Sequence, residues 1–333
     1  MSDKAYVTVI IPTYNRANYI NRAIDSVLNQ TYKAIEIIVV DDNGDNTPMQ
    51  LEMIKKMERY KDNKNVIYIK HKTNKNGAAA RNTGISLAKG KYITFLDDDD
   101  YYLPTRIENL VNLMEERKEY DAAYTSMVVV CNKKIIEYKK ANLEGNLQKE
   151  MLKQKSFFGT GSNMIFTAKS LKSIGGFDEQ FRRNQDLEVF VRFFRKYKIA
   201  ALDKILVIKN VDDRSNLKTF DLIYNSKIKY LEVFKNDIEK YTEPIQKDIY
   251  LSNYYELVRF SAKYKNKLLN LKRIIKSTKD NNININLKFI IITFVYYING
   301  WIHLKQGFDL IKSKFKKNTY DQDLLNFIEE MEQ

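Results

Sequence analysis

The chain has 333 residues, of which 44% are hydrophobic and 29% charged, a balance that excludes a globally disordered protein and suits one large α/β domain with a smaller appendage. Its single cysteine, Cys131, excludes a disulfide framework and a cysteine-based zinc site and fits a reducing cytosol. The formal net charge is +14, and much of it is local, because 263–317 hold thirteen Lys or Arg against two Asp, an excess of eleven.

In the first third of the chain, continuous apolar runs typical of buried strands alternate with segments whose apolar residues recur at helical spacing. Val7 to Ile11 (VTVII) is a continuous, mostly β-branched run, which predicts a strand buried on both faces and not a signal peptide. Further strands are expected at 35–40, 66–69 and 92–96, and helices at 18–30, 51–60 and 78–88. Strands alternating with helices predict a parallel sheet, in which ligands bind at the carboxyl ends of the strands.

The pattern becomes mixed after Asp121. The expected elements are a hairpin of 122–130 with 134–138 around Asn132-Lys133, a short helix at 167–174 ended by Gly175-Gly176, and a helix at 185–197. From Phe220 onward the pattern is helical and rich in Tyr and Lys, so a boundary between two regions is predicted there.

Four consecutive aspartates, Asp97 to Asp100, follow the strand expected at 92–96. Carboxylates this close repel one another, and a divalent cation offsets that cost. Oxygen ligands favour Mg²⁺ or Mn²⁺, which typically bridge a few carboxylates and substrate phosphates. The alternative is an acidic cap for a helix starting near Leu103-Pro104, but one aspartate suffices for a cap. The run therefore predicts a metal site.

Polar residues also follow the other strands of the predicted sheet. Asp41 and Asp42 could accept hydrogen bonds from a base or a ribose, although a β-turn also favours Asp-Asn-Gly. The stretch Gly77 to Ile85 (GAAARNTGI) opens a helix with small residues that allow close packing on the sheet. Arg81 in this helix either contacts a phosphate or only supports that packing.

The chain resembles glycosyltransferase family 2, of the GT-A fold, in four segments of matching order and spacing: VTVIIPTYNRANYINRAIDSVLNQTY, IEIIVVDDNGDN, GAAARNTGI and GKYITFLDDDDYYLP. The resemblance continues through GTGSNMIFTAKSLKSIGGFDEQF (159–181) and RNQDLEVFVRFF (183–194). It implies an α/β fold with a Rossmann-like mixed sheet flanked by helices, and an inverting enzyme similar to those that build bacterial polysaccharides. It also implies a nucleotide-binding half at 1–104 and an acceptor half at 105–219. The helical pattern after this domain predicts a C-terminal region at 220–333 that could associate with a membrane.

The resemblance further implies roles at the matching positions. The nucleotide-sugar site would comprise Pro12, Thr13, Tyr14, Asn15, Asp41, Asp42, Gly77, Arg81, Asp97 and Asp98. Within it, Asp42 would contact uracil and Asp98 the ribose. Asp99 and Asp97 would hold Mn²⁺ or Mg²⁺. Asp186 matches the catalytic base, with Glu188 as the nearby alternative; without the resemblance, Asp186 would be interpreted as a helix cap.

Two departures from the family pattern refine this expectation. The chain lacks Gln-x-x-Arg-Trp, the acceptor-end signature of processive members, and its one tryptophan is Trp301, so a non-processive enzyme is expected. The stretch 205–217 also lacks the histidine that family members often place near the diphosphate, and Arg214 is a candidate substitute.

The most apolar stretch lies in the C-terminal region, at Phe289 to Ile298 (FIIITFVYYI). It is well short of the roughly 20 residues that span a bilayer as a helix. A core helix and a monotopic membrane contact both remain open, and so do a solvated basic face and attraction to an anionic membrane for the lysines around it. No nucleic-acid-binding motif is evident.

The expected reaction moves a sugar from a nucleotide diphosphate donor, UDP above all, to a hydroxyl of a glycan or lipid-linked glycan. The expected location is the cytoplasm, with peripheral attachment to the inner face of the cell membrane. Two alternatives stay open: a polyprenyl-phosphate sugar transferase, and a non-catalytic subunit that only binds nucleotide sugars.

Overall fold

The structure is a computed structural model that describes residues 6–211, 219–264, 266–280, 283 and 322–331. The chain divides into two compact units. The first comprises Met1–Gln148, Ser156–Asp212 and Leu325–Gln333, and the second comprises Lys149–Lys155 and Asp213–Leu324.

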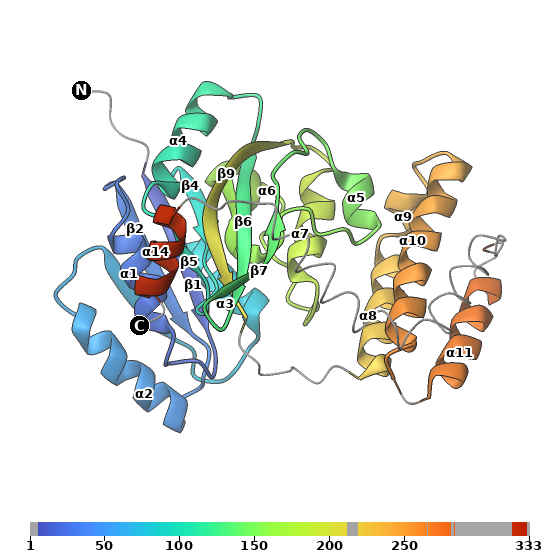
Figure 1. The fold of residues 1–333 in the computed structure, drawn as a ribbon, viewed down its shortest axis with the longest axis horizontal. Coiled ribbons are helices and arrows are strands. Elements are labelled where there is room, and N and C mark those ends of the chain that lie inside the picture. The colour runs from blue at the N-terminus through green and yellow to red at the C-terminus, as the bar shows by residue number, and fades with distance from the viewer. Residues whose placement is uncertain (1–5, 212–218, 265, 281–282, 284–321, 332–333) are drawn as a thin grey trace. The chain divides into compact units, whose positions relative to one another are not determined.

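The first unit is built on one mixed sheet, to which nine of the described strands belong (Figure 1). They are β1 (Val7–Thr13), β2 (Ile35–Asp41), β3 (Val66–Lys70), β4 (Tyr92–Phe95), β5 (Tyr101–Tyr102), β6 (Ala122–Cys131), β7 (Lys134–Lys139), β8 (Met164–Thr167) and β9 (Ile199–Asn210). Their order is β3-β2-β1-β4-β8-β6-β9-β5, with β7 paired to β6. The pairs among β3, β2, β1 and β4 are parallel. The four strands predicted in the first third are thereby confirmed.

Beyond β4 the sheet becomes mixed, as the resemblance to the GT-A fold implied. Strand β8 runs antiparallel to both β4 and β6, and β5 runs antiparallel to β9. The hairpin of β6 and β7 is confirmed, with Asn132 and Lys133 both at positive φ, 48° and 62°. Two successive positive φ angles match the right-handed twist of a tight hairpin.

Helices cover both faces of this sheet. They are α1 (Ile20–Leu28), α2 (Pro48–Met57), α3 (Gly77–Leu87), α4 (Arg106–Glu116), α6 (Ala168–Ser173) and α7 (Gln185–Phe193), with single 3₁₀ turns η1 (Glu58–Tyr60) and η2 (Gly161–Asn163). The short helix α5 (Gln148–Leu152) begins at the last residue of the first stretch of this unit and continues in the second unit. One face of β1 packs in a core with α1, α2 and α4. Helix α3 packs on the other face, where a Cβ added to Gly84 would lie within 3.0 Å of three Ile10 side-chain atoms. The predicted close approach of this helix is therefore confirmed.

The acidic-cap alternative for the aspartate run is wrong. Helix α4 begins at Arg106 with Thr105 at its N-cap, and the short strand β5 separates it from Asp100. All four aspartates therefore lie in the loop between β4 and β5.

The second unit contains the helices α8 (Phe220–Val233), α9 (Lys235–Ile238), α10 (Glu243–Ser261) and α11 (Lys267–Asp280), and α14 (Gln322–Met331) spans the division between the units. Among the described residues, no helix is long and apolar enough to cross a membrane. The apolar run Phe289 to Ile298, Trp301 and Arg214 lie outside the described residues.

Candidate active site

The carboxyl ends of β1, β2 and β4 bring the predicted nucleotide-binding residues to one edge of the sheet. The Oγ1 of Thr13, at the end of β1, donates to Asp98, 2.7 Å away. The backbone N–H of Asp42, just after β2, donates to the Thr13 carbonyl at 2.9 Å. Pro12 is half-buried, whereas Tyr14 and Asn15 are exposed beyond the strand end. Parallel pairing thus assembles residues that are distant in sequence.

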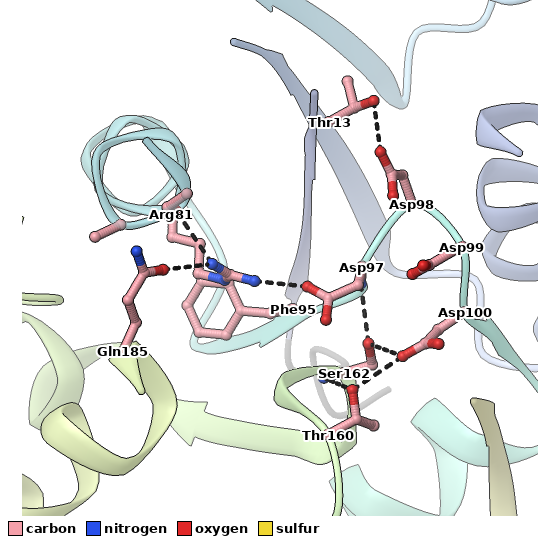
Figure 2. A network of polar contacts seen from close by, with 12 residues as sticks. Thr13, Arg81, Phe95, Asp97, Asp98, Asp99, Asp100, Thr160, Ser162 and Gln185 are labelled. Carbon is pink, nitrogen blue, oxygen red and sulfur yellow. Dashed lines mark hydrogen bonds and ion pairs between the residues drawn. The ribbon is translucent and has the colours of Figure 1, made fainter. Parts of the chain in front are cut away.

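The aspartates after β4 have different partners, and Figure 2 shows those of Asp97, Asp98 and Asp100. Arg81 donates to Asp97 at 2.6 Å. Arg16 forms an ion pair with Asp99 and lies 3.5 Å from Asp98. Because two arginines face four carboxylates, and Asp98 and Asp99 share one of them, the mutual repulsion is only partly offset.

The hydroxyl groups of Thr160 and Ser162 hold the C-terminal end of the aspartate turn, which comprises Asp97 to Asp100. Asp100 accepts hydrogen bonds from Thr160 at 3.0 Å and from Ser162 at 2.6 Å. The Ser162 hydroxyl also accepts the backbone N–H of Asp97, at 2.9 Å. The backbone N–H of Asn210, at the end of β9, donates to Asp100 at 3.2 Å. The Gly-Thr-Gly-Ser segment therefore holds the aspartate turn in place (Figure 2).

The aspartate turn is short of positive charge. Burial, followed by repulsion from Asp99, raises the pKa of Asp98 to about 7. Burial also raises the pKa of Asp99 and, well above the ordinary aspartate range, that of Asp100. The described residues contain no group of three or more His, Cys, Asp or Glu side chains arranged to hold a metal ion. Carboxylate oxygens are nonetheless the donors that Mg²⁺ and Mn²⁺ take, with substrate phosphates completing the shell, so the residues fit such an ion.

Asp41 and Asp42 are both buried and fully engaged by neighbouring groups. Asp41 accepts from Tyr68 and from the backbone and side chain of Asn43. Asp42 lies 2.7 Å from a ring nitrogen of His71. It also accepts the backbone N–H groups of Lys75 and Asn76, at 2.8 and 2.9 Å, and the Asn74 side chain. Asp42 therefore shapes the 71–76 loop beside the strand ends, and its contact with a nucleoside stays a prediction.

A cavity of about 230 Å³ opens next to the aspartate turn. Its lining comprises Arg81, Asp97, Gly161, Met164, Phe177, Arg182, Arg183, Asn184, Gln185 and Asp186. Arg81 crosses from α3 to Asp97 and also donates to Gln185 at 3.0 Å, which links α3 to α7 (Figure 2). Gly77 leaves room for this link, since a Cβ there would lie 3.0 Å from Arg81.

The two candidate bases, Asp186 and Glu188, lie in different surroundings. Asp186 is half-buried in the first turn of α7, and it lines the cavity. Loss of hydration is the main cause that raises the pKa of Asp186 above the usual aspartate range. Glu188 is only 1% exposed and forms an ion pair with Arg192 one turn later. Of the two carboxylates, therefore, Asp186 is the one that borders open space.

Sequence reasoning assigned no site role to Arg16, Thr160, Ser162, Arg182 or Arg183. Thr160 and Ser162 lie in the Gly-Thr-Gly-Ser segment (159–162), which was predicted only to be part of a segment that resembles the family. Polar residues between glycines ahead of an apolar run (MIF) are the signal that could have singled them out.

The family described as Glycosyl transferase family 2 matches residues 8–175, so the chain belongs to this family and is a glycosyltransferase. An uncharacterized glycosyltransferase of Rickettsia prowazekii is 30% identical over 247 residues, which cover 71% of this chain and 73% of the relative. The Escherichia coli UDP-Glc:alpha-D-GlcNAc-diphosphoundecaprenol beta-1,3-glucosyltransferase WfaP is 42% identical over 114 residues, 34% of this chain and 43% of that one.

Solved structures agree on the fold. Residues 1–349 of S. aureus TarS match with a TM-score of 0.57 and 20% identity, covering 79% of this chain and 76% of that one. A mannosyltransferase of Pyrobaculum calidifontis, in complex with GDP-Man and Mn²⁺, matches with a TM-score of 0.56 and 16% identity, covering 93% and 83%. The chain therefore has the GT-A fold, with helices following the mixed sheet.

Proposed function

We propose that this chain is an inverting, non-processive glycosyltransferase that moves a sugar from a UDP-sugar to a hydroxyl of a glycan or lipid-linked glycan. The observation that carries the proposal is the cavity that Asp97 and Asp186 share. One carboxylate belongs to the turn after β4, and the other to the first turn of α7. A direct displacement needs charge stabilisation on the leaving-group side of the sugar and a base on the other side.

The donor half of the site comprises the strand ends and the aspartate turn. Asp97 and Asp99 would hold Mn²⁺ or Mg²⁺, and Asp98 would hold the ribose. When bound, the ion would offset the negative charge that develops on the leaving diphosphate. Similar proteins support a nucleotide-sugar donor, since a TarS structure contains UDP-GlcNAc and the P. calidifontis enzyme contains GDP-Man and Mn²⁺.

The acceptor half of the site centres on Asp186. Its carboxylate would accept the proton of the acceptor hydroxyl as that oxygen attacks the anomeric carbon and the bond to the diphosphate breaks. The attack comes from the face opposite the leaving group, so the anomeric configuration inverts without a covalent enzyme intermediate. Glu188 is a poorer candidate, because Arg192 already pairs with it in the interior.

The test compares Asp186→Asn with Glu188→Gln. Asp186→Asn keeps the size and removes the basicity, so turnover should fall by roughly 10²- to 10⁴-fold, while UDP binding survives. Acceptor-dependent UDP release measures the first, and calorimetry measures the second. Nearly full activity of Asp186→Asn would reject Asp186 as the base. That result would favour a polyprenyl-phosphate acceptor, whose phosphate needs no deprotonation. Absence of donor hydrolysis and transfer in the unaltered chain would instead favour a non-catalytic nucleotide-sugar-binding subunit.

A further inference from the structure

Two arginines of the cavity, Arg182 and Arg183, have no role in the proposed transfer reaction. Arg182 and Arg183 stand just ahead of α7 and line the same cavity as Asp186. Arg182 is exposed and Arg183 is half-buried. Within the part of the chain that the structure describes, neither side chain forms a hydrogen bond or an ion pair with another residue.

The third arginine of the cavity, Arg81, lies in a different environment. Asp97 and Gln185 accept hydrogen bonds from its guanidinium, at 2.6 and 3.0 Å. Asp97 therefore balances Arg81, and Asp186 is the one remaining carboxylate of the lining, against two further guanidinium groups. The lining beside the proposed base consequently carries an excess of positive charge, which favours an anionic ligand.

The backbone at this point adds to the attraction. Asn184 adopts the left-handed conformation, with φ 56°, and its own side chain forms no capping hydrogen bond with the helix that follows. The Asp186 carboxylate accepts the backbone N–H of Leu187 at 3.0 Å. The residues of its first turn, Gln185 and Asp186, line the cavity as well. A helix N-terminus carries a partial positive charge, which favours an anion nearby. Guanidinium groups match phosphate oxygens in geometry, because each offers several N–H donors in one plane.

We propose that Arg182 and Arg183 bind a phosphate group of the acceptor, so that the acceptor is a phosphate ester whose attacking hydroxyl lies elsewhere on the same molecule. This inference rests on the proposed function, in which Asp186 deprotonates that hydroxyl. The donor diphosphate belongs with the aspartate turn, whereas the two arginines adjoin the base. The phosphate could be that of a lipid carrier or of a polyol phosphate, and the chemistry recognised by the arginines is the same in both.

The test uses the full chain saturated with UDP and Mn²⁺, so that the donor half is occupied. Glycerol 3-phosphate and farnesyl phosphate are titrated by calorimetry, with glycerol and farnesol as uncharged controls. The unaltered chain should bind the phosphates and not the alcohols. Arg182→Gln/Arg183→Gln should weaken phosphate binding roughly tenfold to a hundredfold, the factor expected when charge-assisted hydrogen bonds are lost. Preference for farnesyl phosphate supports a lipid carrier, and equal binding supports a polyol phosphate.

A matched control removes two positive charges outside the cavity. Lys196 and Lys198 are exposed beyond the end of α7, and Lys196→Gln/Lys198→Gln should leave both titrations unchanged. The proposal is overturned if the arginine double variant binds the phosphates as the unaltered chain does. It is also overturned if that variant loses affinity for UDP with Mn²⁺ by a similar factor, because the arginines then serve the donor. Asp186→Asn should retain phosphate binding, so failure of the proposed base is visible separately.

Discussion

At the scale of single residues, the four aspartates after β4 could be predicted as a site from the sequence, but their partners could not. The four aspartates stand out in the sequence because a charged run after a buried strand has no ordinary packing role. Their partners do not stand out. Arg16 reaches Asp99 across 83 positions. That contact depends on β1 pairing in parallel with β4, with Ile10 opposite Phe95, which brings the loops after both strands together.

The predicted contact between Asp42 and the nucleoside can be tested by substitution of this residue. Asp42→Ala should weaken UDP binding roughly tenfold to a hundredfold, as loss of a charge-assisted hydrogen bond does. It should also lower the free energy of unfolding by about 1–3 kcal/mol, because the N–H groups of Lys75 and Asn76 lose their acceptor. Calorimetry and denaturant titration measure the two effects.

The control for Asp42 is Asp45→Ala, which removes an exposed carboxylate close to Asp42 in the chain. It should change neither quantity. Unchanged UDP affinity in Asp42→Ala, together with lower stability, would show that Asp42 only shapes the 71–76 loop and that the nucleoside binds elsewhere.

At the scale of elements, the parallel strands β1 to β4 and the hairpin of β6 and β7 follow from the sequence, whereas β8 and β9 do not. Strands β1 and β2 are mostly apolar and buried on both faces, a pattern that few other elements produce. Strand β9 instead contains the polar stretch Asp203-Lys204 between two apolar ends, so its pattern is interrupted. Strand β8 has only four residues, too few for periodicity to separate it from a helix start.

We expect removal of the metal ion to weaken UDP binding at the turn after β4. UDP should bind at least roughly tenfold more tightly with Mn²⁺ than in EDTA, a difference of about 1.4 kcal/mol or more. The reason is that a cation relieves the repulsion among Asp97, Asp98 and Asp99 and bridges them to phosphate. Asp99→Asn should reduce this difference, whereas Asp45→Asn should preserve it. Equal affinity in EDTA, measured by calorimetry, would contradict a metal role for the turn.

The close packing of α3 on β1, at Gly84 and Ile10, can be tested by substitution. Gly84→Val should lower the free energy of unfolding by about 1–3 kcal/mol, since the new side chain would overlap Ile10, which is fully buried and cannot move aside. Ser86→Val introduces the same side chain at an exposed position of this helix and should have little effect. Combining Gly84→Val with Ile10→Ala should cost less than the two changes added together. Strict additivity in denaturant titrations would mean that the two residues do not restrain each other.

At the scale of the whole molecule, the sequence places a boundary near Phe220, and the structure shows two units whose chain segments interleave. Residues Lys149–Lys155 belong to the helical unit although they lie far ahead of it in the sequence. The contacts responsible include two hydrogen bonds to backbone carbonyls: Tyr230 of α8 donates to the Met151 carbonyl at 2.8 Å, and Asn253 of α10 donates to the Leu152 carbonyl at 2.9 Å. Side chains that bond to a distant carbonyl leave no periodic signal, so such an exchange could not be predicted.

We expect the helical unit to bind an anionic membrane surface and thereby to hold the enzyme near a lipid-linked acceptor. Residues 263–317 carry an excess of eleven positive charges. Each Lys or Arg near an anionic surface contributes about 1 kcal/mol, an attraction that salt screens. In this segment, Leu268 and Leu269 of α11 are 67% and 66% exposed, among the lysines of that helix. Exposed leucines beside lysines suit insertion at the headgroup boundary.

Co-sedimentation with vesicles tests this membrane prediction. The full chain should bind vesicles rich in phosphatidylserine at low salt, bind phosphatidylcholine vesicles weakly, and lose most binding at high salt. Leu268→Gln/Leu269→Gln should reduce the salt-resistant part, because the leucines contribute burial of apolar surface and not charge. Leu222→Gln, at a 52% exposed leucine of α8, is the matched control and should bind as the unaltered chain does. Absence of binding to anionic vesicles at low salt would leave the helical unit without a membrane role, and the acceptor would then have to reach Asp186 from solution.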